Sequence, residues 1–185
     1  PWKGITGKNA RTMTAWIRTS KRDAAILNWG QNARDKKWTF RTQSNNGTPD
    51  TIRIETNGAY AAGSAKVSDN RWHHVAAVFE KNTSTNKIRF YVDGQPDALS
   101  ASGNRAPNTA SNQAVRIGRD FANRYFHGHL DDVRIYDRAL TAEELSLDPA
   151  RIDMWAEGTH TLSYLATDAA GNTGAATRVV TYKKN

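Results

Sequence analysis

The chain has 185 residues, no cysteine and a formal net charge of +8 at pH 7. This length suits one domain with at most a small appendage. The six Trp, six Tyr and five Phe exclude a chain that is disordered throughout, because disordered chains lack the aromatic residues that form a core. The lack of cysteine excludes disulfides, thiolate metal sites and cysteine nucleophiles. No apolar run approaches the roughly 18 residues that span a bilayer, so we expect no membrane insertion.

The positive charge would attract polyanions such as nucleic acid or anionic polysaccharide. However, the basic residues occur singly at alternating positions, as Arg41, Arg53 and Arg116 do. We therefore expect them on outward, solvated positions of strands, and no specific nucleic-acid site. Weak affinity for sulfated or uronic-acid glycans is the alternative interpretation.

Alternation of apolar and polar residues, with turn residues between the runs, is typical of an all-β sandwich. In residues 11–19, Met13, Ala15 and Ile17 alternate with more polar residues, so one face of this strand can be buried. Further strands are predicted at residues 25–29, 37–43, 51–56, 72–80, 87–92, 114–118 and 126–136.

The connecting segments carry residues that turns require. Asp93-Gly94 suits a type I′ turn, and residues 95–113 are predicted to form one long surface loop, where a binding surface is plausible. One short helix is predicted near residues 141–147, because Thr141 and Glu144 have the spacing of a capping box. This helix would place Leu140 and Leu145 on the body of the sandwich.

The last 35 residues differ in pattern, and we predict a domain at 1–148 followed by a tail at 151–185. Residues 159–167 and 176–182 are two predicted strands, and together they resemble the last strand pair of bacterial immunoglobulin-like repeats. An isolated hairpin is marginal in water, so we expect it to pack on the first domain or on another chain.

Several segments resemble, in this order, the laminin-G-like (concanavalin A-like) jelly-roll modules of extracellular proteins. The pieces that carry the resemblance are Trp72-His73-His74-Val75-Ala76, Phe90-Tyr91-Val92-Asp93-Gly94 and the closing strand with its helix start, residues 130–140. Residues 11–17, 26–30, 38–40, 52–55 and 115–118 also resemble the family. The resemblance implies a jelly-roll module that binds carbohydrate, glycoconjugate or protein, often with calcium, and that is secreted or on the bacterial cell surface. It also implies a strand before Gly4 that lies beside the closing strand. This strand is missing here, so we expect either that the chain is a fragment or that the tail hairpin or a neighbour's strand takes its place.

Asp131 is the candidate metal ligand. Strand alternation places it on the same side as Val133 and Ile135, so an inward carboxylate needs compensation. The resemblance implies a calcium ligand at this position of the closing strand. The alternative is a carboxylate that accepts backbone N–H bonds at the end of a sheet.

Carbohydrate binding needs aromatic rings flanked by amide, guanidinium or carboxylate groups. The candidates are Tyr60, in the turn after Asn57, and Asn123, Arg124 and Tyr125 before the closing strand. Each of them is alternatively an ordinary loop residue. Core packing is expected for four tryptophans that lie on the resembling strands, namely Trp16, Trp29, Trp38 and Trp72.

We expect no catalysis. A glycosidase of this fold would carry paired carboxylates on one strand, and no Glu-x-Asp-x-Glu pattern occurs; Glu55 and Glu80 are isolated. No Gly-x-Ser-x-Gly segment occurs either. The predicted function is an extracellular recognition module, carbohydrate-binding or adhesive. The alternative is a structural subunit of a bacterial surface assembly, in which neighbours exchange strands and self-associate through the C-terminal hairpin.

Overall fold

The computed structural model describes residues 1–44, 47–146, 158–167 and 173–182. The chain divides into two compact units, Pro1–Leu145 and Ser146–Asn185. The predicted domain boundary at 148–151 lies outside the described residues.

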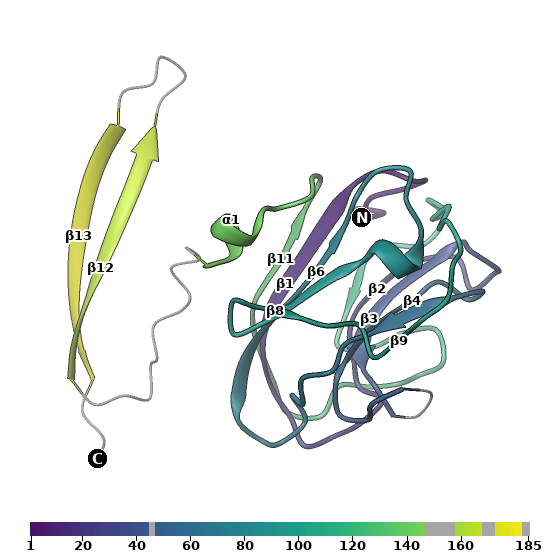
Figure 1. The fold of residues 1–185 in the computed structure, drawn as a ribbon, viewed down its shortest axis with the longest axis horizontal. Helices are drawn as coiled ribbons and strands as arrows, with labels where there is room; N and C mark the ends of the chain where they lie inside the picture. Colours follow the sequence, from purple (N-terminus) through teal and green to yellow (C-terminus); the bar gives the residue numbers. More distant parts are fainter. Residues whose placement is uncertain (45–46, 147–157, 168–172, 183–185) are drawn as a thin grey trace. The chain divides into compact units, whose positions relative to one another are not determined.

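The first unit consists of two antiparallel sheets (Figure 1), as the alternating pattern predicted. The five-stranded sheet has the order β11 (His129–Tyr136), β1 (Arg11–Arg18), β6 (Trp72–Phe79), β7 (Arg89–Val92) and β8 (Gln95–Asp97). The six-stranded sheet has the order β10 (Arg116–Ile117), β2 (Ala25–Gly30), β3 (Lys37–Thr42), β4 (Ile52–Glu55), β5 (Tyr60–Ala62) and β9 (Ala101–Ser102). One turn of 3-10 helix, η1 (Thr85–Lys87), precedes β7.

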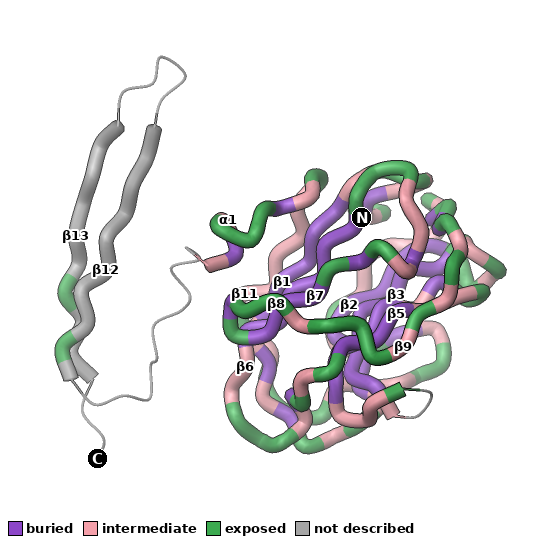
Figure 2. Tube along the Cα trace, in the orientation of Figure 1, coloured by how far each residue is buried: buried purple, intermediate pink, exposed green. Residues whose placement is uncertain are grey.

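The core lies between these two sheets, and the strands around it are buried along most of their length (Figure 2). Trp29 and Trp38 of the six-stranded sheet are fully buried there, and Trp38 meets Phe79 of the other sheet edge-on with 5.3 Å between ring centroids. Core packing is therefore confirmed for these two tryptophans. It is wrong for Trp16 and Trp72, which are only half-buried.

The strand β1 buries both of its faces. Met13, Ala15 and Ile17 point into the core, as predicted. Thr12 on the opposite face is also buried, because its hydroxyl donates to the carbonyl of Arg138 and accepts from the N–H of Leu140. The segment after the closing strand thus covers the outer face of the five-stranded sheet.

That cover ends in the short helix α1 (Ala142–Ser146), and the predicted capping box is confirmed. The N–H of Glu144 donates to Thr141 Oγ1 at 3.2 Å, and the N–H of Thr141 donates to Glu144 Oε2 at 2.9 Å. Leu140 and Leu145 pack with Ala76, Val78 and Tyr91 in a second apolar cluster. The helix therefore lies on the sandwich, as its sequence predicted.

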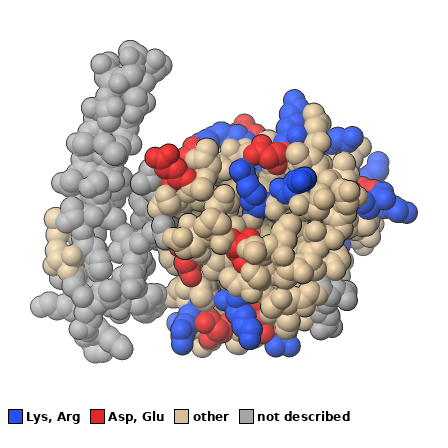
Figure 3. All heavy atoms as spheres, in the orientation of Figure 1, with Lys and Arg blue, Asp and Glu red and all other residues tan. Residues whose placement is uncertain are grey.

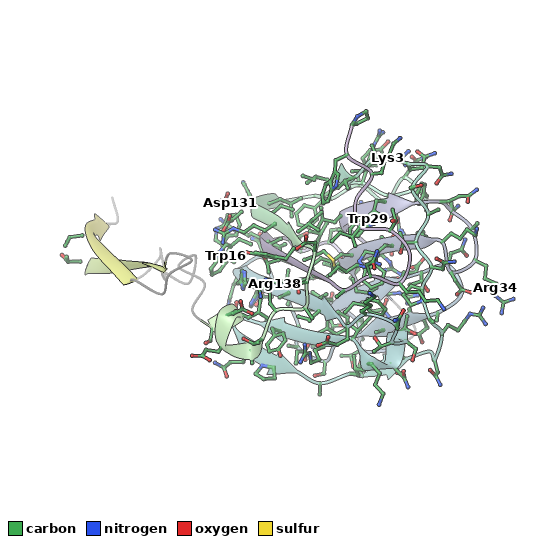
Figure 4. The ribbon with its side chains drawn as sticks, turned by 90° about the horizontal axis from the view of Figure 1, so that it is seen from above. Lys3, Trp16, Trp29, Arg34, Asp131 and Arg138 are labelled. Atoms are coloured by element: carbon green, nitrogen blue, oxygen red, sulfur yellow. The ribbon has the colours of Figure 1, made fainter. Side chains whose placement is uncertain are left out.

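The strand β11 is interrupted by a bulge, which corrects the predicted orientation of Asp131. Its pairing with β1 shifts between Thr14 and Trp16, and Asp132 has a φ of 47°. A bulge inserts one extra residue and so reverses the alternation beyond it. Leu130 and Val133 consequently both face the core, whereas Asp131 lies opposite Trp16 and is exposed. Figure 4 shows Asp131 at the margin of the first unit and Trp29 inside it.

The region after β7 contains more structure than the predicted loop at 95–113. Asp93 and Gly94 both have positive φ, 52° and 71°, as the predicted type I′ turn requires. This turn connects β7 directly to β8, and β9 follows, so the long-loop prediction is wrong for these segments. Tyr60 likewise begins β5 instead of ending a turn.

The second unit contains one antiparallel hairpin of β12 (Gly158–Thr167) and β13 (Thr173–Tyr182), which form a sheet of their own. Its two strands were predicted, although β13 begins three residues earlier than expected. Within the part of the chain that the structure describes, no helix is long and apolar enough to cross a membrane.

Candidate functional site: the outer face of the six-stranded sheet

The outer face of the six-stranded sheet carries a row of polar side chains. Trp38, Phe40, Ile52 and Ile54 of β3 and β4 face the core, so the residues that alternate with them face away from it. Strand pairing aligns five such residues across neighbouring strands, in the order Arg116, Asn28, Thr39, Glu55 and Tyr60. Five of the six strands of this sheet, all except β9, thus contribute one residue each to a continuous row.

Glu55 lies at the centre of a network of charged side chains beside this row. It forms ion pairs with four cations: Lys37, Arg41 Nη2 at 2.9 Å, Arg53 Nη2 at 3.4 Å and Arg124 Nη1 at 3.5 Å. Arg41 and Arg124 also contact Asp23 Oδ1, at 2.6 and 3.3 Å. We call these six residues, Asp23, Lys37, Arg41, Arg53, Glu55 and Arg124, the Glu55 cluster.

The cluster is largely removed from solvent, and this affects its ionisation. Burial alone would raise the pKa of Glu55, but the hydrogen bond from Lys37 and the charges of Lys37, Arg124 and Arg41 hold it well below its ordinary value. Burial, together with the charges of Arg41 and Arg124, lowers the pKa of Arg53 to about 10. Glu55 is therefore a permanent carboxylate near neutral pH and cannot serve as a general acid.

The loop between β10 and β11, residues 119–126, brings Arg124 to the cluster. Asp120 is almost fully buried and organises this loop, because it accepts the N–H groups of Ala122 and Arg124 at 2.8 and 3.1 Å. The same carboxylate also accepts a hydrogen bond from the side chain of Arg124, with 2.6 Å between Arg124 Nε and Asp120 Oδ2. Arg124 is thus held at both ends of its guanidinium, by its own loop and by the sheet.

Two polar atoms of the face lack partners. Asn28 Oδ1 and Arg53 Nε are buried, and neither has a hydrogen-bond partner among the residues that the structure describes. A buried polar atom without a partner costs free energy, which an added ligand atom or a bound water would recover. Both atoms belong to the polar face around Glu55.

The structure brings together two of the four residues predicted to bind carbohydrate. The Arg53 guanidinium lies 3.9 Å from the ring centroid of Tyr60, and Arg124 reaches Glu55, which pairs with Tyr60 in the ladder. Asn123 and Tyr125 flank Arg124 in the loop and are exposed. No contact connects either of their side chains to the Glu55 cluster within the described part of the chain.

Most of the cluster was missed at the level of sequence. Arg41 and Arg53 were expected to be solvated, but only 4% and 8% of their surface is exposed. Arg116 is half-buried. The available signal was the alternation of charges of both signs on two adjacent strands, Lys37-x-Thr39-x-Arg41 and Arg53-x-Glu55, which lets the charges pair across the ladder. On the face shown in Figure 3, Lys and Arg are interspersed with Asp and Glu and form no continuous basic area.

The surroundings of Asp131 do not favour the predicted calcium site. Its carboxylate is exposed and accepts the N–H of Asp132 at 2.8 Å. Within the described ranges, no group of three or more His, Asp or Glu side chains is placed to hold a metal ion. Calcium takes six to eight oxygen ligands. Calcium binding at Asp131 stays a prediction.

Two antiparallel sheets around one core, with a polar outer face on one of them, define the class of lectin-like β-sandwiches. The chain belongs to the concanavalin A-like lectin/glucanases superfamily, whose family model matches residues 3–146. The resemblance inferred from the strand segments is thereby confirmed. No curated protein sequence matches the chain.

Solved structures share the fold at low sequence identity. Domain 4 of AbnA, an extracellular arabinanase of Geobacillus stearothermophilus solved in complex with arabinotriose, is 18% identical, with a TM-score of 0.60 over 79% of this chain and 68% of that one. A pentraxin of Limulus polyphemus is 15% identical, with a TM-score of 0.56 over 97% and 85%. Domains LG4-5 of the mouse laminin α1 chain are 15% identical, with a TM-score of 0.55 over 76% and 42%.

Proposed function

We propose that the chain is a non-catalytic carbohydrate-recognition module that binds glycans on the outer face of its six-stranded sheet. The observation that carries the proposal is the pair of unpartnered buried atoms on this polar face, Asn28 Oδ1 and Arg53 Nε, together with the Tyr60 ring, which stacks on the Arg53 guanidinium. Sugars offer hydroxyl groups that both donate and accept, and C–H faces that pack on aromatic rings. Asn28 supplies an acceptor, Arg53 a donor and Tyr60 a ring.

The similarity to a domain solved with arabinotriose supports this kind of ligand, although it extends to the fold alone. The ionisation of Glu55 supports a non-catalytic role. Glycoside hydrolysis needs one carboxyl group that is protonated and gives its proton to the leaving group. Four cations keep Glu55 ionised, so it does not fulfil that requirement.

We also propose that the protein is secreted or lies on the surface of a bacterial cell. This location is supported by the family and by the arabinanase, which is named as extracellular. Adhesion through surface glycans is the corresponding biological role.

A glycan array probed with the full chain tests the proposal, once with added calcium and once with a chelator. We expect binding to at least one glycan class, and a loss of about fivefold in affinity for Tyr60→Ala, since a ring contact contributes about 1 kcal/mol. Arg89→Ala is the matched control, because Arg89 lies on the other sheet and pairs with the exposed Glu80. Binding to no glycan under either condition contradicts the proposal. A requirement for calcium would support the site at Asp131.

A second candidate function is strand exchange in a surface assembly. It is favoured by the sheet order among the described residues, in which β11 ends its sheet and the β12–β13 hairpin forms a separate one. Sheet edges expose unpaired N–H and C=O groups that another strand can pair with. Light scattering of the full chain and of a chain without residues 157–185 tests it. We expect the full chain to form oligomers and the shortened chain to be monomeric. If both the full and the shortened chain are monomeric, this candidate function is contradicted.

A further inference from the structure

Arg53 is the cation of the Glu55 cluster with the poorest compensation. Its Nη1 donates to Gln43 Oε1 at 3.1 Å, and its Nη2 lies 3.4 Å from Glu55 Oε2. Its Nε is buried and has no partner among the described residues. The edge of the guanidinium that carries Nε and Nη2 therefore makes one long ion pair and no hydrogen bond that satisfies Nε.

The surroundings of Arg53 carry an excess of positive charge. Four cations of the cluster share two carboxylates, and Asp120 adds a third only through Arg124. Glu55 divides its two oxygens among all four cations. A buried cation with incomplete compensation is unfavourable, and an added anion would relieve it.

The geometry of this edge selects the shape of that anion. The Nε and Nη2 groups of an arginine point in parallel and match the two oxygens of a planar carboxylate. Tyr60 is stacked on the face of the same guanidinium and is half-buried, so it is the member of the pair that borders solvent. Because Nε is buried, a ligand reaches this edge when the Tyr60 ring moves aside, and it then presents its sugar ring to the tyrosine and its carboxylate to Arg53.

We propose that the glycan recognised on this face is a uronic acid, whose carboxylate docks on the Nε–Nη2 edge of Arg53 beside Tyr60. This inference rests on the proposed carbohydrate-binding function and names the ligand class of the same face. Neutral sugars satisfy the unpartnered Nε but leave the excess charge. The carboxylate of a uronic acid accepts the hydrogen bond from Nε and also compensates the excess positive charge.

Calorimetric titration of the full chain tests the inference. The probes are oligogalacturonate, oligomannuronate, oligoguluronate and glucuronic-acid-containing oligosaccharides, each paired with its carboxyl-reduced neutral counterpart. We expect at least one uronate to bind at roughly 0.15 M ionic strength, because buried charges are screened less than exposed ones. We expect the reduced counterpart to bind at least about tenfold more weakly, since hydrogen bonds to charged groups are the stronger ones.

Two substitutions locate the contact. Arg53→Lys keeps the positive charge but lacks the parallel pair of donors, and we expect it to weaken uronate binding about tenfold. Arg89→Lys is the matched control on the other sheet, with the same chemical change at an exposed arginine, and we expect no change in affinity. Circular dichroism and thermal melting of each variant report whether it is folded. The comparison of uronate with reduced glycan uses the unaltered chain and is independent of variant folding.

The outcomes separate the inference from the proposed function. Equal binding of uronates and their reduced counterparts contradicts the inference and leaves the carbohydrate-binding function standing. Binding to neutral or sulfated glycans alone on the glycan array has the same consequence. Binding to no glycan contradicts both. Uronate binding that Arg53→Lys does not change contradicts the assignment to the Arg53 edge.

Discussion

Glu55 is the residue on which the charged face depends. It compensates Lys37 and Arg53, for which no other carboxylate within ion-pair distance is found among the described residues, and it shares Arg41 and Arg124 with Asp23. The resulting network fixes four long side chains in one arrangement. A binding face built in this way is pre-organised, which lowers the entropic cost of holding a ligand.

Replacing Glu55 by Gln should therefore destabilise the fold. The substitution leaves Lys37 and Arg53 buried without a counter-charge, and breaking a buried ion pair typically costs about 3 to 5 kcal/mol. Urea unfolding of the two proteins measures the difference in the free energy of unfolding.

Glu80→Gln is the control for this prediction. Glu80 pairs with Arg89, and about half of each side chain is exposed, 49% and 46%. Exposed pairs contribute about 0 to 1 kcal/mol, so this variant should unfold almost as the natural chain does. If both variants lose the same stability, Glu55 does not hold the cluster together.

His73 lies between two carboxylates and should make stability depend on pH. Its Nδ1 is 2.8 Å from Asp93 Oδ2, and its Nε2 is 3.1 Å from Asp69 Oδ1. The hydrogen bond with Asp93, and the charges of both carboxylates, raise the pKa of His73 against the opposing effect of burial. A raised pKa in the folded state stabilises the fold fully below the unfolded value of about 6.5, and this contribution is lost as pH rises through the folded pKa.

We accordingly expect His73→Gln to cost more stability at about pH 5.5 than at about pH 9, because glutamine carries no charge at either pH. Urea unfolding of both proteins at the two pH values gives the comparison. A difference that grows toward high pH would show that the imidazole is not charged between these carboxylates.

At the scale of single elements, α1 has five residues and depends on its capping box. Arg138 and Thr141 both bond to Glu144, and these bonds lower the pKa of its carboxyl group to about 2. Thr141→Ala removes the hydroxyl that accepts the N–H of Glu144, and N-cap losses cost about 1 kcal/mol.

Thr141→Ser keeps the hydroxyl and serves as the control for this prediction. Thermal unfolding should place it near the natural chain and place Thr141→Ala below both. Equal destabilisation by Ser and Ala would mean that the methyl group of Thr141, and not its cap, stabilises the helix.

The longer elements follow their sequence patterns, and the shorter ones do not. Alternation located the long strands β1 and β6 because each repeats its apolar face several times. The strands β8 and β9 have three and two residues, so no period can develop, and Pro96 within β8 also disfavours a strand. The bulge at Asp132 was equally invisible, because one inserted residue changes register without changing composition.

The candidate site, too, contains residues that could be predicted from the sequence and residues that could not. Tyr60 and Arg124 were selected as an aromatic ring and a polar neighbour, and the structure places both at Glu55. The buried cations were not predicted, since a charged residue on a strand is ordinarily solvated. Only the pairing of β3 with β4 shows that Arg41 and Arg53 lie opposite one another and that Glu55 lies within reach of both.

At the scale of the whole molecule, the two units should differ in local stability. In the first unit, β1 and β6 lie inside a five-stranded sheet and pack on the core. The β12–β13 hairpin has two strands, and such hairpins are marginal in water by themselves.

We therefore expect the amides of β12 and β13 to exchange hydrogen much faster than those of β1 and β6 in dilute solution. Hydrogen exchange followed by mass spectrometry measures this. Protection of the hairpin that rises with protein concentration would favour strand exchange between chains, whereas strong protection at every dilution would contradict the expectation.

The fold and the face together lead to one central claim, that this β-sandwich recognises glycans on the outer side of its six-stranded sheet. The most direct measurement is the NMR footprint of the tightest-binding glycan on the uniformly labelled chain. We expect chemical-shift changes at β3, β4, β5 and the 119–126 loop, with the largest at Arg53, Glu55 and Arg124. Changes confined to β11 around Asp131, with β3 and β4 unaffected, would contradict it.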